Sequence, residues 1–61
     1  MEDSKNTVLL SYAIGTEVDA INMYSFLIQN LPSSCRETLE HIRDEEKEHA
    51  LELLELIKQL P

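Results

Sequence analysis

The sequence predicts an all-α protein, an antiparallel hairpin of two helices that pairs with a second copy to complete a four-helix bundle. Three observations lead to this prediction. The 61 residues include only one glycine and two prolines, and the common Leu, Glu, Ala and Lys are good helix formers. Only one proline, Pro32, interrupts the interior of the chain. Apolar residues recur at the three- and four-residue spacing of a helix face.

The first helix is expected over residues 6–29, before the segment Asn30-Leu31-Pro32-Ser33-Ser34. Leu31 precedes a proline, and this position disfavours helical backbone geometry. Asn30 is suited to close the helix in the left-handed conformation. We therefore expect a turn over residues 30–34.

The second helix is expected over residues 35–60. Ser34 and Glu37 have the spacing of a capping box, in which each side chain bonds the backbone of the other residue. So short a connection between two long helices predicts an antiparallel hairpin. Residues 1–61 are thus expected to form a single domain.

A chain of this size rarely buries enough apolar surface to be stable alone. Disulfides usually support such small domains, but Cys35 is the only cysteine, so no disulfide can form within the chain. The remaining supports are a metal, oligomerisation or both. We therefore expect the chain to associate with itself.

The charge of the chain is strongly acidic, with 12 acidic residues against five basic ones and a net charge of −7. Such a surface repels nucleic acid and anionic lipid and attracts cations. No segment approaches the roughly 20 apolar residues of a membrane span, and Met1–Lys5 does not resemble the start of a signal peptide. With a lone cysteine, these features predict a cytoplasmic protein without nucleic-acid or membrane partners.

Each expected helix has one stripe of residues that is apolar at both ends and polar in the middle. In the first helix the stripe consists of Leu10, Ala13, Glu17, Ala20, Tyr24, Leu27 and Leu31. In the second it consists of Leu39, Ile42, Glu46, His49, Leu53, Leu56 and Leu60.

The surfaces beside the two stripes differ. The first helix has further apolar residues, which predict burial on most of its sides: Val8, Ile14, Val18, Ile21, Met23, Phe26 and Ile28. The second helix has a row of glutamates that predicts a solvated, charged face: Glu45, Glu48, Glu52 and Glu55.

The hairpin places the polar parts of both stripes at one level. With the turn near residues 32 and 33, facing residues have numbers that sum to about 65, so Glu17 lies level with residue 48. Glu46 and His49 lie on either side of that position. Two-metal carboxylate bundles use a Glu from each of two helices and a Glu-x-x-His from each of the other two. Two copies of the chain would supply this complete set.

The mixed ligand set suits iron, because carboxylates stabilise ferric iron and imidazole also suits ferrous iron. The polar layer is also compatible with three arrangements that need no metal. Protonated carboxylates, a layer that sets helix register or a salt bridge could each compensate for burial. The nearest basic residues, Arg43 and Lys47, are expected beside the stripe. His41 is expected on the surface, and Tyr24 in the core.

The residues around these glutamates resemble the encapsulated ferritin family, within the ferritin-like superfamily of two-helix chains. The stretch Glu-Val-Asp-Ala-Ile-Asn-Met-Tyr, residues 17–24, is similar to the first metal-binding helix of that family. The stretch Arg-Asp-Glu-Glu-Lys-Glu-His-Ala, residues 43–50, is similar to the second. The resemblance covers residues 8–60.

This resemblance implies a ferroxidase, which oxidises ferrous iron with dioxygen for iron storage or detoxification. It implies that Glu17, Glu46 and His49 are the metal ligands and catalytic residues, with two iron ions per dimer. Calcium, zinc or manganese are expected as substitutes. Family members form two-fold dimers and a ring of ten chains inside an encapsulin shell. The short helix and shell-addressing tail usual in the family are not found in residues 1–61.

Two further functions are compatible with the sequence. A rubrerythrin-like or manganese-containing protein would use the same site to reduce peroxide. A rubredoxin-type Cys-x-x-Cys motif would favour a rubrerythrin, and the sequence has none. A hairpin that only oligomerises, with a polar layer to set its register, would have no enzymatic activity.

Overall fold

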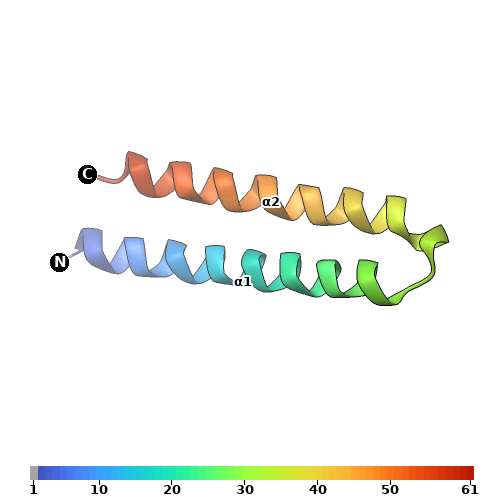
Figure 1. The fold of residues 1–61 in the computed structure, drawn as a ribbon. Helices are drawn as coiled ribbons and strands as arrows, with labels where there is room; N and C mark the ends of the chain where they lie inside the picture. Colours follow the sequence, from blue (N-terminus) through green and yellow to red (C-terminus); the bar gives the residue numbers. More distant parts are fainter. Residues whose placement is uncertain (1) are drawn as a thin grey trace.

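The protein is a hairpin of two long helices, seen in a computed structural model that describes residues 2–61 and the side chains of residues 5–61. Helix α1 spans Glu2–Asn30, the short 3-10 helix η1 spans Ser33–Cys35, and helix α2 spans Arg36–Gln59. The two long helices run antiparallel, with both chain ends at the same end of the hairpin (Figure 1). The predicted all-α hairpin is confirmed. Helix α1 begins four residues earlier than expected.

The end of α1 differs from the sequence prediction. Asn30 does not adopt the left-handed conformation, since no non-glycine residue among residues 2–61 has a positive φ. The Leu31 N–H instead donates to the Leu27 carbonyl at 2.8 Å, and Asn30 Nδ2 donates to the Phe26 carbonyl at 2.7 Å. These bonds satisfy carbonyls in the last turn without a change of backbone hand.

The predicted capping box at the start of α2 is also wrong. The N-cap residue is Cys35, and no side chain caps this helix end. A 3-10 turn precedes the helix, and the Cys35 N–H donates to the Pro32 carbonyl at 2.9 Å. The tight turn takes the place that a Ser34 cap would have filled.

The seam between the helices matches the predicted stripe closely in α1 and less closely in α2. In α1 the half-buried stripe residues are Leu10, Ala13, Glu17, Ala20, Tyr24 and Leu27, whereas Leu31 is exposed. In α2 the half-buried residues are Leu39, Glu40, Ile42, Arg43, Glu46, Ala50, Leu53 and Ile57, and Leu60 directly after the helix is also half-buried.

Two stripe predictions in α2 are therefore wrong. His49 and Leu56 are exposed, and Ala50 and Ile57 are half-buried. The stripe residue after Glu46 can be His49, three positions later, or Ala50, four positions later. Both positions lie on the same side of the helix as Glu46. The contact with α1 uses the second choice. His49 and Leu56 consequently lie on one flank of the seam.

Residues 5–61 of the hairpin form no buried core of their own. None of residues 5–61 is buried, and large apolar side chains such as Val8, Tyr12 and Phe26 are at least 60% exposed. The predicted burial of α1 on most sides is thus not achieved by a single chain. No helix in residues 2–61 has the length and hydropathy needed to cross a membrane.

Candidate metal centre

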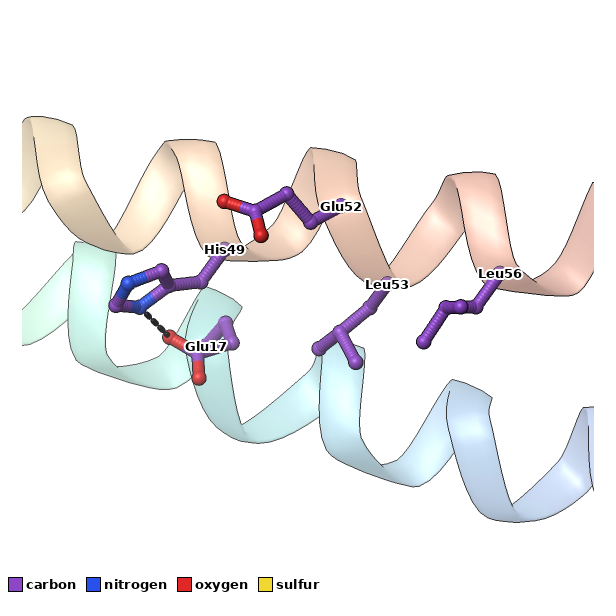
Figure 2. Close-up of a pocket in the computed structure, with 5 residues that line it drawn as sticks. All are labelled: Glu17, His49, Glu52, Leu53 and Leu56. Atoms are coloured by element: carbon purple, nitrogen blue, oxygen red, sulfur yellow. Dashed lines mark ion pairs between the residues drawn. The ribbon is translucent and has the colours of Figure 1, made fainter.

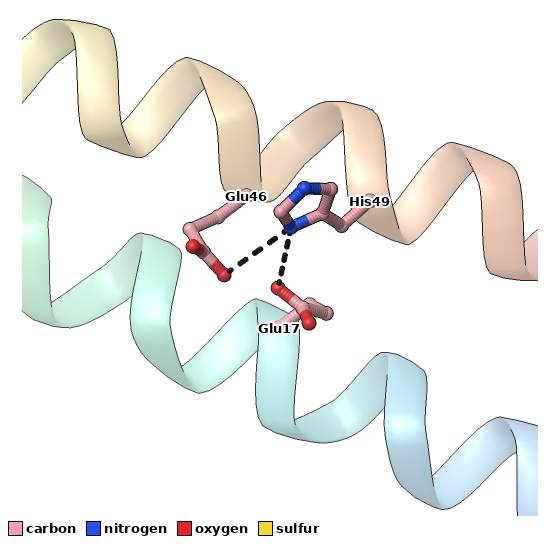
Figure 3. Close-up of side chains that lie close together, drawn as sticks. All are labelled: Glu17, Glu46 and His49. Carbon is pink, nitrogen blue, oxygen red and sulfur yellow. Dashed lines mark ion pairs between the residues drawn. The ribbon is translucent and has the colours of Figure 1, made fainter.

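Two carboxylates and one imidazole lie together halfway along the seam, at the level that the sequence predicts. Glu17 comes from α1, and Glu46 and His49 come from facing turns of α2 (Figure 3). His49 Nδ1 lies 3.7 Å from Glu17 Oε2 and 4.0 Å from Glu46 Oε2. One ligand atom from each residue lies within 4.8 Å of the others. The expected level of Glu17 against residues 46–49 is therefore observed.

The two carboxylates are much less exposed than the imidazole. The side chains of Glu17 and Glu46 are 22% and 23% exposed, and that of His49 is 51% exposed. Glu17 Oε2 is shielded from solvent and accepts no hydrogen bond. A shielded carboxylate oxygen without a donor is unfavourable. The site thus offers a carboxylate oxygen, Glu17 Oε2, whose lone pairs are free to bind a cation.

A lysine or arginine does not neutralise this layer. Arg43 lies 3.6 Å from Asp44, and its shielded Nε has no hydrogen-bond partner. Within the described chain, no Lys or Arg nitrogen lies within 4.0 Å of the Glu17 or Glu46 carboxylates. A salt bridge to a basic residue of the same chain therefore does not compensate for burial of the polar layer.

The neighbours of Glu46 raise the pKa of its carboxyl group in the metal-free chain. A hydrogen bond with Glu17 raises the pKa of Glu46, and burial and the negative charges of Glu17 and Glu45 raise it further. The interaction with His49 lowers the pKa of Glu46 and opposes these effects. A second carboxylate nearby and partial desolvation both disfavour the charged form of Glu46. A cation placed between the two carboxylates would offset the repulsion that raises this pKa.

A hollow of about 390 Å³ opens beside the cluster, on the flank that carries His49 (Figure 2). It is lined by Glu17, His49, Glu52, Leu53 and Leu56. The sequence placed Glu52 on the solvated face of α2. The three-residue step from His49 to Glu52 is the signal that they could be neighbours on one face.

Three further residues lie apart from the cluster. His41 is exposed and its Nε2 lies 3.2 Å from Glu45 Oε1, so the predicted surface position is confirmed. Tyr24 is half-buried in the seam. A Cβ added at Gly15 would meet nothing within 4 Å, so no contact within the hairpin requires a glycine there.

The donor set fits iron, with hard carboxylate oxygens and a borderline imidazole nitrogen on one small cluster. A family profile for rubrerythrin matches residues 9–61, which include all three cluster residues. The chain belongs to the rubrerythrin family. This family is ferritin-like and binds iron. No significant match was found among curated proteins or among solved structures.

Family membership confirms the broader part of the resemblance seen in the sequence. The ferritin-like assignment holds for this rubrerythrin-family chain. The narrower assignment, to encapsulated ferritins, stays a prediction. The ligand roles of Glu17, Glu46 and His49 likewise remain predictions, which the geometry of the cluster supports.

Proposed function

We propose that the chain is one half of a di-iron ferroxidase, completed when a second copy packs against the flank that carries His49. One chain supplies two carboxylates and one imidazole, which is half of the ligand set of a di-iron carboxylate bundle. The half-set lies at the side of the hairpin, where His49 and Leu56 are exposed. A two-fold partner would add the other half and cover the apolar residues beside it.

One observation supports the metal more than any other. Glu17 Oε2 is shielded from solvent and without a hydrogen-bond donor, although it lies beside a second carboxylate and a half-exposed imidazole. A layer that only sets helix register would be expected to satisfy its own polar atoms. A cation is the group that all three side chains could bind together.

Ferrous iron is the substrate in this proposal. Two ferrous ions, one dioxygen and two protons yield two ferric ions and one hydrogen peroxide, so each iron gives one electron. The Glu17 and Glu46 carboxylates favour the ferric product through their negative charge, and neutral His49 retains affinity for the ferrous state. His49 Nδ1 is the nitrogen that faces both carboxylates.

The test is aerobic oxidation of ferrous iron, followed by the absorbance of ferric product. Glu46→Ala removes two carboxylates per dimer and should reduce the rate to that of the protein-free control. His49→Ala should weaken iron binding and slow oxidation. His41→Ala is the matched control, because His41 is an exposed imidazole that pairs with Glu45 away from the cluster. Equal rates for all four proteins at the protein-free level would reject the ferroxidase.

The rubrerythrin family match favours a second candidate, in which peroxide is the oxidant. Two ferrous ions, one hydrogen peroxide and two protons then yield two ferric ions and two waters. Anaerobic protein loaded with ferrous iron should be mixed with either dioxygen or peroxide in a stopped-flow instrument. Oxidation at least about tenfold faster with peroxide would assign the protein to peroxide reduction in place of ferroxidase activity.

The larger assembly is a separate proposal. A ring of ten chains and enclosure in an encapsulin shell follow from the sequence resemblance alone. Sedimentation of the purified protein measures the first, and co-purification with a shell protein measures the second. A two-fold dimer without either would still be sufficient for the di-iron site.

A further inference from the structure

Glu52 lies on the hollow beside the cluster and has no role in the proposed ligand set. Figure 2 shows its side chain on α2, next to His49 and across the hollow from Glu17. It is not part of the group whose ligand atoms lie within 4.8 Å of one another. Glu52 is therefore near the path to the cluster without being one of its members.

The carboxylate of Glu52 is unpaired, unlike two of its neighbours on α2. Glu45 pairs with His41 at 3.2 Å, and Glu55 pairs with Lys58 at 3.4 Å. The side chain of Glu52 forms no hydrogen bond or ion pair with any residue of the described chain. Its charge is consequently available to a cation from solvent before a second copy packs against this flank.

The charges on the two flanks of α2 favour approach from the side of the hollow. Glu52 is exposed and lines the hollow that contains Glu17 and His49. Lys47 lines an otherwise apolar hollow of about 380 Å³ on the opposite flank. A hollow lined by one sign of charge, with apolar walls such as Leu53 and Leu56, concentrates the opposite ion and raises its association rate.

We propose that Glu52 is a capture residue, which binds a divalent cation briefly and delivers it to Glu17, Glu46 and His49. The inference rests on the proposed metal site and adds to it the route by which the ion arrives. Glu52 is one helical turn from His49, close enough for an ion to pass from one side chain to the other. The residue should therefore control the rate of loading without changing the number of ions bound.

The experiment measures Co²⁺ binding to the full chain by stopped-flow absorbance, because this readout requires no turnover. Glu52→Gln removes the charge and keeps the shape of the side chain. Glu55→Gln is the matched control, since it makes the same change on the same helix at a carboxylate that Lys58 already pairs. We expect Glu52→Gln to slow association roughly threefold to tenfold at low ionic strength and Glu55→Gln to leave it unchanged.

Two further readouts decide the role of Glu52. The final stoichiometry of Glu52→Gln should equal that of the wild type, and its rate defect should shrink at about 1 M salt, where screening extends over about 3 Å. Equal rates for the two variants would overturn the inference. A lower final stoichiometry for Glu52→Gln would also overturn it, because Glu52 would then be a ligand. Failure of the wild type to bind Co²⁺ would instead reject the proposed site, and the inference with it.

Discussion

The two flanks of the hairpin are built from the same two helices and differ in chemistry. One flank has a hollow lined by Glu17, His49 and Glu52 together with Leu53 and Leu56. The other has a hollow of nearly the same volume, lined by Ile14, Ile21, Lys47, Ala50, Leu51 and Leu54. Both are open to solvent, since no side chain in residues 5–61 is buried.

The difference shows how one short chain can separate assembly from chemistry. The apolar flank offers burial to any packed neighbour, and its hollow is lined by no possible metal ligand. The polar flank exposes an incomplete ligand set, so it gains a function only from a neighbour that supplies the missing ligands. The identity of the partner therefore matters more on the His49 flank than on the opposite flank.

A large effect on metal binding is expected from placing a charge on each flank in turn. Leu56 and Leu54 are 46% and 43% exposed and lie on opposite flanks, so they form a matched pair. Leu56→Glu should weaken metal binding by roughly 30-fold or more, about 2 kcal/mol, because it prevents the pairing that completes the site. Leu54→Glu should leave metal binding intact. Equal losses in isothermal titration with Co²⁺ would show that the flanks do not differ in this way.

Metal binding should stabilise the protein through the His49 flank. A cation that binds only the folded, paired chains adds about 2.7 kcal/mol at a concentration 100 times its dissociation constant. Thermal unfolding followed by circular dichroism, with and without Co²⁺, measures this gain. Glu46→Ala should show no gain. A similar gain in that variant would mean that the ion binds elsewhere on the acidic surface.

A smaller effect on the free energy of unfolding is expected from pH, because the environment of Glu46 raises its pKa. The raised pKa of Glu46 means that the folded metal-free chain holds a proton more tightly than the unfolded chain does. The tighter proton binding stabilises the folded chain at low pH, and this stabilisation is lost as pH rises through the pKa of Glu46 in the folded chain. The stability of the wild type relative to Glu46→Gln should therefore decline with rising pH above about 4.3. Chemical denaturation of both proteins over a series of pH values measures this decline.

The metal-bound protein should respond to pH in the opposite direction. A cation at this site competes with the proton that the raised pKa of Glu46 favours, so Co²⁺ affinity should increase as pH rises through the acidic range. Titrations in two buffers with different ionisation enthalpies measure the protons released. Release of no proton at acidic pH would contradict a raised pKa of Glu46 in the metal-free protein.

The smallest effect is expected at a position outside both flanks. Gly15 lies about 160° around α1 from Glu17, and nothing lies within 4 Å of the place a Cβ would take. Gly15→Ala should stabilise the helix by about 0.5–1 kcal/mol and leave Co²⁺ stoichiometry unchanged. Chemical denaturation gives the stability change. A destabilised variant would reveal a close contact at Gly15 in the assembled protein.

The sequence alone determined the hairpin and the level of the candidate site. Pro32 marks the turn, and the lengths of the two helices then place Glu17 opposite Glu46 and His49 by the rise of the helix alone. These features depend on local chain geometry. The expected cap and left-handed closure near the turn were wrong because a 3-10 turn satisfies those backbone groups in another way.

The tertiary structure decided which side of each helix meets the other. From Glu46 the stripe can continue through His49 and Leu56 or through Ala50 and Ile57, and the sequence does not distinguish the two because Leu56 and Ile57 are both apolar. Packing against α1 selects Ala50 and Ile57 for the seam and leaves His49, Glu52 and Leu56 beside the hollow. The two arrangements differ by a rotation of α2 through a fraction of a turn, which breaks no helical hydrogen bond. One rotation would enclose the polar layer within the hairpin, and the other leaves a half-site that is open to a partner.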